Sequence, residues 1–106
     1  MKVYLSKINE SWIIDRVREE WYQYNRAIST DSIDEADIIW IISPWLWKKE
    51  KKKALRNKHV VCSIYHFEDS DFKDSGLRDF KKRDKYVDTY HVISRKTLKE
   101  LERLTN

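Results

Sequence analysis

Apolar residues follow two different spacings along the first third of this chain. Met1–Ile8 alternates apolar and polar residues, which is the pattern of a half-buried strand. From Ser11 to Asn25, apolar side chains recur every three to four residues and predict a helix. Ala27–Thr30 has room for a short edge strand only, and Ile33–Ala36 for about one helical turn. The chain is therefore expected to open with a strand and a helix.

The segment Asp37–Ser43 is apolar at nearly every position, and the largely apolar runs His59–Tyr65 and Val87–Ile93 are predicted as the next buried strand and the last strand. Continuous apolar runs of this length are typical of strands that are buried on both faces of a parallel sheet. Pro44 ends the first run, because proline cannot donate a ladder hydrogen bond. We expect these segments to form three strands of the sheet, with Val87–Ile93 as the last one.

Polar segments separate the apolar runs and hold the remaining helices. The basic stretch Lys48–Asn57 favours a helix. Phe67–Lys85 is the longest polar stretch, and we expect a mobile loop there with a short helix over Leu77–Arg83. Ser94 is expected to cap a final helix. The apolar stripe of that helix is Leu98, Leu101 and Leu104.

Alternation of strands and helices predicts an α/β fold in one domain, residues 1–106. The expected architecture is a Rossmann-like, doubly wound parallel sheet of about five strands with helices on both faces and right-handed crossovers. In such sheets ligands bind beyond the carboxyl ends of the strands, near the point where the strand order reverses. We therefore expect the functional residues to lie at those ends.

Composition narrows the classes of function. The 106 residues are 41% hydrophobic and 13% aromatic, which indicates a folded domain. With Gly76 as the single glycine, neither a GxGxxG loop nor a P-loop can be written. Cys62 is the single cysteine and lies in an apolar run, so we expect it in the core and expect no internal disulfide. The longest apolar run, Ile38–Ile42, is far shorter than the roughly 20 residues of a membrane span, so a cytoplasmic protein is expected.

The net charge of +4 is unevenly placed along the chain. Much of the positive excess lies in Lys48–Lys58, with the sequence KKEKKKALRNK. This segment predicts either contact with an anionic surface such as a membrane, or a solvated helix face. Nucleic acid is the less favoured partner, because this is one cluster without a recognised motif.

His66 is the sharpest candidate for chemistry. It ends a predicted buried strand and is followed by Glu68 and Asp69, which could orient its imidazole. The alternative is a histidine that only caps the strand end by hydrogen bonding. A metal site of these three residues would need a further ligand from elsewhere. His91 lies inside the last predicted strand and is expected to be packed or at a sheet face.

Trp45 and Trp47 precede a run of lysines at a predicted loop-to-helix junction. Aromatic rings beside cations are typical of a membrane-surface contact or of stacking on a sugar ring. The equally weighted alternative is that one or both rings pack under the basic helix as core.

Three stretches of the chain, DIIWIISPWLWKK, VVCSIYHFED and RDKYVDTYHVISRKTLKELERLT, together resemble a known family. In order and spacing they are similar to the N-terminal, acceptor-side domain of family-four glycosyltransferases of the GT-B fold. The resemblance implies a hexosyltransferase of polysaccharide biosynthesis that moves a sugar from a nucleotide-sugar to a glycan or lipid-linked acceptor. It also implies catalytic roles for His66, Glu68 and Asp69. The implied substrate-binding residues are Lys7, Asn9, Trp45, Trp47, Ser94 and Arg95.

The chain departs from the family's pattern at two places. Lys7–Ser11 holds no glycine, where the family usually has a glycine-rich loop. The family's nucleotide-sugar pocket and paired glutamates would lie after Asn106, so the resemblance implies a half-domain that needs a donor-binding domain or partner chain. No cofactor is expected.

Three hypotheses of function therefore stand. The first is the acceptor-side domain of a glycosyltransferase. The second is a non-catalytic module that binds a glycan or an anionic lipid, with Lys48–Lys58 on a membrane surface. The third is an assembly protein that kept the fold, lost the site and forms homo- or hetero-oligomers.

Overall fold

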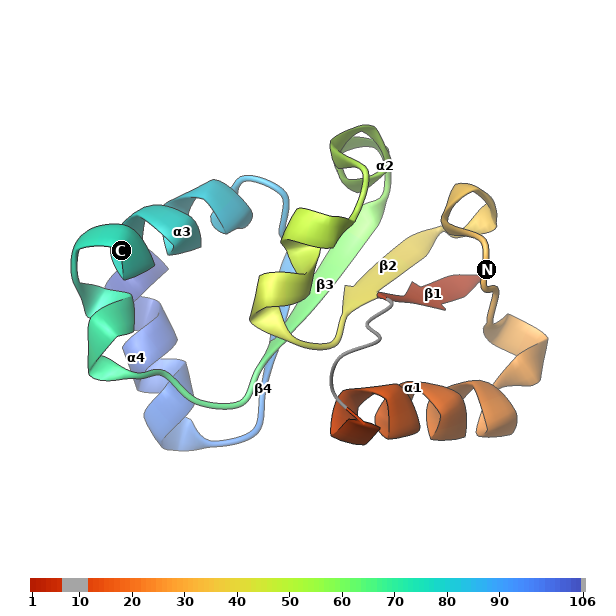
Figure 1. Cartoon of the computed structure of the whole chain (residues 1–106), viewed down its shortest axis with the longest axis horizontal. Coiled ribbons are helices and arrows are strands. Elements are labelled where there is room, and N and C mark those ends of the chain that lie inside the picture. The colour runs from red at the N-terminus through yellow and green to blue at the C-terminus, as the bar shows by residue number, and fades with distance from the viewer. Residues whose placement is uncertain (7–11, 106) are drawn as a thin grey trace.

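A computed structural model describes residues 1–6 and 12–105 of the chain. The strands are β1 Val3–Leu5, β2 Ile38–Ile41, β3 His59–Ile64 and β4 Thr89–Val92. The α-helices are α1 Trp12–Tyr24, α2 Lys52–Asn57, α3 Asp74–Asp84 and α4 Arg95–Thr105, arranged as Figure 1 shows. Short 3-10 helices are η1 Arg26–Ile28, η2 Ile33–Glu35, η3 Pro44–Lys49 and η4 Asp69–Phe72.

The strands form one parallel sheet in the order β1-β2-β3-β4, so the predicted Rossmann-like α/β fold is confirmed. Within the described residues the sheet has four strands instead of about five. The expected edge strand is reduced to a single parallel bridge between Ser29 and Val3. After β1 the chain first forms the bridge at Ser29 on one side of β1, and it then returns to pair β2 with the other side. The later strands follow on the β2 side. This is the reversal that a doubly wound sheet requires.

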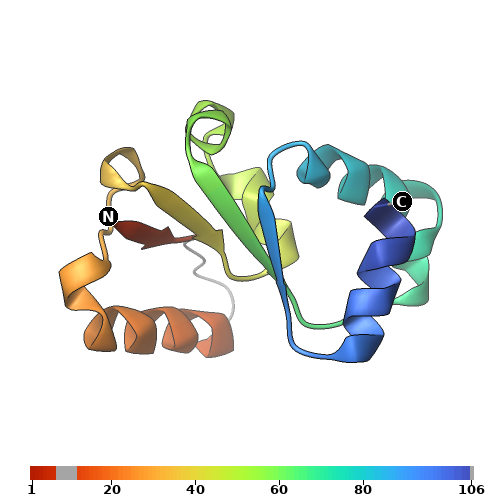
Figure 2. The same cartoon turned by 180° about the vertical axis from the view of Figure 1, so that it is seen from behind.

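Helices lie on both faces of the sheet. On one face α1 covers β1 and β2, where the rings of Trp21 and Trp40 meet edge to face at 5.9 Å. On the other face α3 packs on β4, where Phe80 stacks on Tyr90 at 6.1 Å. Figures 1 and 2 show α1 near β1 at one end of the sheet, and α3 and α4 together at the other end.

The apolar runs of β2 and β3 form the centre of the core. The fully enclosed apolar side chains come mainly from these strands and the turn after β2: Leu5, Ile39, Ile41, Ile42, Leu46, Leu55, Val60, Cys62 and Ile64. The buried Ser63 hydroxyl accepts a hydrogen bond from Trp40 Nε1 at 2.8 Å and contacts His91 Nδ1 at 2.9 Å. These partners satisfy the buried hydroxyl group of β3.

Two predicted segments differ in the structure. The expected helix over Lys48–Asn57 starts only at Lys52, because Pro44 opens the 3-10 turn η3. The Lys52 ammonium then donates to the carbonyl oxygens of Trp47 and Glu50 and closes that turn. The expected mobile loop over Phe67–Lys85 is largely helical, as η4 and α3.

Helix α4 begins as predicted. The Ser94 hydroxyl accepts a hydrogen bond from the Thr97 backbone N–H at 3.1 Å, which is the geometry of an N-cap. Leu101 is buried, whereas Leu98 is exposed. The Arg103 guanidinium lies 4.7 Å from the centre of the Phe72 ring and joins α4 to η4.

Alkaline pH is expected to destabilise the domain partly through Cys62. Burial raises the pKa of its thiol from 9.0 to about 11, so the unfolded chain releases the thiol proton first. Stability from this group is intact below pH 9 and is lost between pH 9 and 11. Between about pH 8 and about pH 10.5, chemical denaturation should show a loss of unfolding free energy about 1–2 kcal/mol smaller in Cys62→Ala than in the wild type. Equal losses in both proteins would contradict this.

Candidate functional site

A cavity of about 340 Å³ opens at the carboxyl ends of β2 and β3. Its walls come from the residues that leave these two strands and from α3. The residues that line it are Ser43, Pro44, Trp45, Trp47, Lys48, Tyr65, His66, Phe67, Glu68, Asp71, Gly76, Asp79, Phe80 and Arg83. Its volume falls in the range of small-molecule sites, and its place agrees with the ligand edge expected for this fold.

His66 and Glu68 lie together at the cavity, as their spacing predicted. His66 Nε2 is 3.2 Å from Glu68 Oε1. The Glu68 carboxylate also accepts the backbone N–H of Asp71, while the Asp71 carboxylate accepts the backbone N–H of Glu68 at 2.7 Å. This capping box holds the carboxylate in place. A neutral imidazole bonded this way carries its proton on Nε2, which leaves Nδ1 as an acceptor.

Arg83 is the cavity residue with the most unusual environment. It is 8% exposed, and its Nε has no hydrogen-bond partner among the described residues. Its guanidinium lies 5.1 Å from the centre of the Phe80 ring. A cation over a ring gains some energy, but a ring does not replace the hydrogen bonds that water would give.

The three carboxylates that line the cavity already have other partners. Asp79 is 3.4 Å from the Lys48 ammonium, and Glu68 contacts His66. Asp71 accepts the backbone N–H of Glu68. The charge of Arg83 is therefore not neutralised by an ion pair within the part of the chain that the structure describes.

The two tryptophans have different surroundings. Trp47 is buried, with its ring centre 5.7 Å from that of Tyr86 and the Lys52 ammonium 4.6 Å above it. Trp45 is 43% exposed, and the Lys49 ammonium lies 5.8 Å from its ring centre. Trp47 thus has the core environment that was one of the alternatives, and Trp45 is the ring with a face open to a ligand.

The remaining predicted site residues are dispersed. Asp69 begins η4 and does not line the cavity. Ser94 caps α4, and Arg95 is exposed at its start, both outside the cavity lining. Lys7 and Asn9 lie outside the described residues. The functional roles of all these residues stay predictions.

Sequence reasoning missed Arg83 as a site residue. Its position carried a signal, because Gly76, Phe80 and Arg83 recur at helical spacing. These three residues share the side of α3 that lines the cavity. A charged residue that lies on the same side of a helix as a buried aromatic residue is a candidate for a functional role in a buried site.

Two further findings concern the described residues alone. Across residues 1–6 and 12–105, no group of three or more histidine, cysteine, aspartate and glutamate side chains is placed to hold a metal ion. In the same residues, no helix has the length and apolar content needed to cross a membrane.

Comparison of the chain with protein-family models, with curated proteins and with solved structures gives no match. The fold is established by the structure itself, and no family is assigned.

Gly76 is expected to be indispensable for the cavity wall. A Cβ at this position would lie 2.1 Å from the carbonyl oxygen of Ser70 and 2.8 Å from Cα of Asp71. Backbone atoms cannot give way cheaply, so Gly76→Ala should push η4 from α3 and destabilise the domain by about 1–3 kcal/mol, despite alanine's better helix propensity. Thermal unfolding measures the loss. The exposed neighbour Ser75→Ala is the control and should change stability by less than about 0.5 kcal/mol.

Proposed function

We propose that this chain is the acceptor-side domain of a glycosyltransferase, and that donor-binding groups come from a further domain or partner chain. The observation that carries the proposal is one cavity that combines His66, Glu68, Arg83 and an exposed Trp45 at the ligand edge of a Rossmann-like sheet. The resemblance of the three sequence stretches to the family supports it independently. The acceptor would be a glycan or a lipid-linked sugar.

In this proposal His66 acts on the acceptor hydroxyl. The hydroxyl oxygen attacks the anomeric carbon of the donor sugar, the bond from that carbon to the nucleotide phosphate breaks, and the imidazole Nδ1 receives the hydroxyl proton. The Glu68 carboxylate, 3.2 Å from Nε2, stabilises the resulting imidazolium. Trp45 offers a ring face on which the acceptor sugar can lie.

Removal of the His66 imidazole should lower sugar transfer by at least about 100-fold, because a positioned general base contributes about that much. The test joins the chain to a complementary donor-binding domain and follows nucleotide release from a panel of nucleotide-sugars. Glu68→Gln should have a smaller effect, because an amide keeps the hydrogen bond and loses the charge.

The matched control is His59→Ala, since His59 is exposed at the start of β3 and bonds Thr89 away from the cavity. Unchanged turnover in His66→Ala would remove this residue from the mechanism. Turnover of a nucleotide-sugar by the chain alone would contradict the half-domain part of the proposal.

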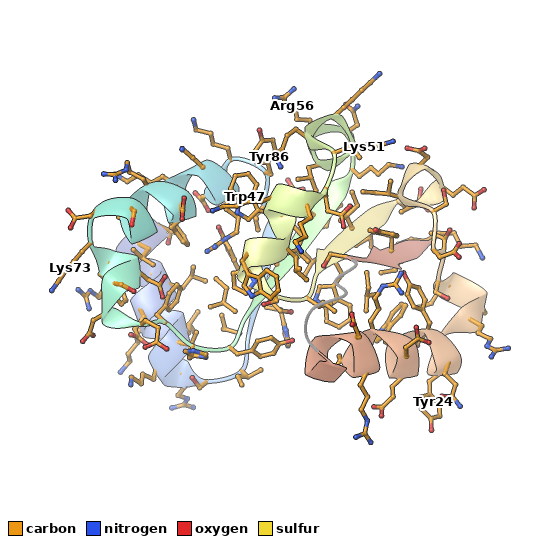
Figure 3. The ribbon with its side chains drawn as sticks, viewed as in Figure 1. Tyr24, Trp47, Lys51, Arg56, Lys73 and Tyr86 are labelled. Atoms are coloured by element: carbon orange, nitrogen blue, oxygen red, sulfur yellow. The ribbon has the colours of Figure 1, made fainter. Side chains whose placement is uncertain are left out.

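A second candidate function, binding to an anionic membrane surface, is favoured by a surface that extends beyond the predicted segment Lys48–Lys58. Tyr86 lies between Trp47, at 5.7 Å, and the Arg56 guanidinium, at 5.8 Å, and so joins α2 to the end of α3, as Figure 3 shows. Two basic stretches 23 residues apart thereby come together. We call their exposed cations, Lys51, Lys53, Arg56, Lys81, Lys82 and Lys85, the basic surface.

Positive charge is concentrated in the two stretches that carry the basic surface. Residues 48–58 and 81–85 hold 11 lysines and arginines and two acidic residues, in a chain whose net charge is +4. The rest of the chain is therefore net negative, which orients this side toward an anionic layer. Because Trp47 is buried, the contact is electrostatic and needs no insertion of that ring.

Neutralising Lys51, Lys53 and Arg56 with glutamine should weaken binding to anionic vesicles by roughly two orders of magnitude, at about 1 kcal/mol per basic residue. Sedimentation with vesicles of phosphatidylserine and phosphatidylcholine measures it, and added salt should weaken the wild type in the same direction.

The control variant neutralises three exposed lysines elsewhere, Lys73, Lys96 and Lys99. It carries the same net charge and should keep most of the binding. Equal loss in both triple variants, or equal binding to neutral vesicles, would remove this candidate. Displacement of the vesicles by equimolar RNA would assign the basic surface to nucleic acid instead.

A further inference from the structure

The buried guanidinium of Arg83 lacks the counter-charge that a structural arginine normally has. At 8% exposure it has lost nearly all of its water, and its Nε has no hydrogen bond among the described residues. An uncompensated buried charge costs free energy, so stability alone does not account for an arginine here. Phe80, which lies under the guanidinium, would pack equally well on an apolar chain of similar length.

The cavity contains carboxylates, yet none of them pairs with Arg83. Asp79 is engaged by Lys48, and Glu68 is engaged by His66. These two pairs are well exposed, with side-chain exposures of 49% and 54% for the first and 71% and 74% for the second. Solvent therefore screens them, whereas Arg83 lies at the buried end. The cavity therefore has solvent-screened carboxylates at its mouth and a desolvated cation at its buried end.

The chemistry of that cation selects the ligand. A guanidinium presents a planar fork of N–H donors that matches two oxygens of a phosphate. At the mouth, Trp45 and Tyr65 are 43% and 38% exposed and offer aromatic faces. A cavity of about 340 Å³ has room for one hexose ring with its phosphate.

We propose that this cavity is a sugar-phosphate site, in which Arg83 binds the phosphate at the buried end and Trp45 and Tyr65 hold the sugar at the mouth. The inference rests on the proposed function for the identity of this ligand as the acceptor. It assigns an acceptor that carries its phosphate next to the sugar, as a sugar 1-phosphate or a lipid-linked sugar phosphate does. Arg83 is here a binding residue and takes no part in proton transfer.

The test is a titration of the whole chain with glucose 1-phosphate, with inorganic phosphate and with glucose, followed by calorimetry and by the shift in melting temperature. Glucose 1-phosphate should bind saturably and raise the melting temperature. Arg83→Met keeps the packing on Phe80 and removes the charge. This variant should bind glucose 1-phosphate at least about tenfold more weakly, because it loses a charge-assisted hydrogen bond. It should be as stable as the wild type or more so.

Arg78→Met is the matched control, because Arg78 is exposed on the same helix and does not line the cavity. It should bind glucose 1-phosphate as the wild type does. Equal affinity in Arg83→Met and the wild type, or no saturable binding by the wild type, would overturn the proposal. Equal affinity of the wild type for inorganic phosphate and glucose 1-phosphate would overturn the assignment of the sugar.

This titration needs no donor domain and no turnover. If Arg83→Met loses binding of glucose 1-phosphate but the complemented enzyme transfers no sugar, the sugar-phosphate site is supported and the transferase is contradicted. If the complemented enzyme transfers sugar equally well with Arg83→Met, the transferase is supported and the role of Arg83 is contradicted.

Discussion

The parallel pairing of β2 with β3 is the constraint on which the rest of the structure depends. In this register Ile39 pairs with Val60 and Ile41 with Cys62, so one face of the pair is continuous and fully buried. Because the strands are parallel, both carboxyl ends reach the same edge. The segments that leave them, η3 and the residues that follow β3, thereby become two walls of one cavity. A shift of one residue in either strand would turn its core side chains to the other face and separate these walls.

The outer edge of β1 shows how side chains can complete a nearly absent strand. Past the single bridge at Ser29, the Tyr22 hydroxyl accepts the Leu5 backbone N–H and donates to the Thr30 carbonyl, both at 2.9 Å. Arg18 Nε donates to the Leu5 carbonyl at 3.1 Å. Helix α1 therefore takes the place of a strand partner and covers the edge that would otherwise be open. The chain therefore still changes sides at β1, although its outer strand is reduced to the single bridge at Ser29.

The parts of the fold that could be predicted from the sequence are those with a local cause. The continuous apolar runs around β2 and β3 need two buried faces, and the pairing of His66 with Glu68 follows from residues two apart on one segment. The helix predicted over Leu77–Arg83 is confirmed as part of α3, but the helical structure that begins at Asp69 was expected as a loop. Its few apolar residues dilute the periodic signal, and its order comes from a capping box and from packing on Tyr90. The helical spacing of Arg83 from Phe80 places both on one side of α3, but that the cavity lies on this side is decided by tertiary contacts.

Helix α3 carries cations of two physically different kinds, and their common helix relates the two proposed functions. Lys81 and Lys82 are exposed, so they act over a distance that salt screens. Arg83 follows them in sequence but is buried, so it acts only on a group that enters the cavity. Both belong to one rigid helix whose Phe80 is stacked on β4. If both proposals hold, α3 would therefore fix the position of a bound anionic surface relative to the cavity, and a lipid-linked sugar phosphate would be an acceptor that uses both.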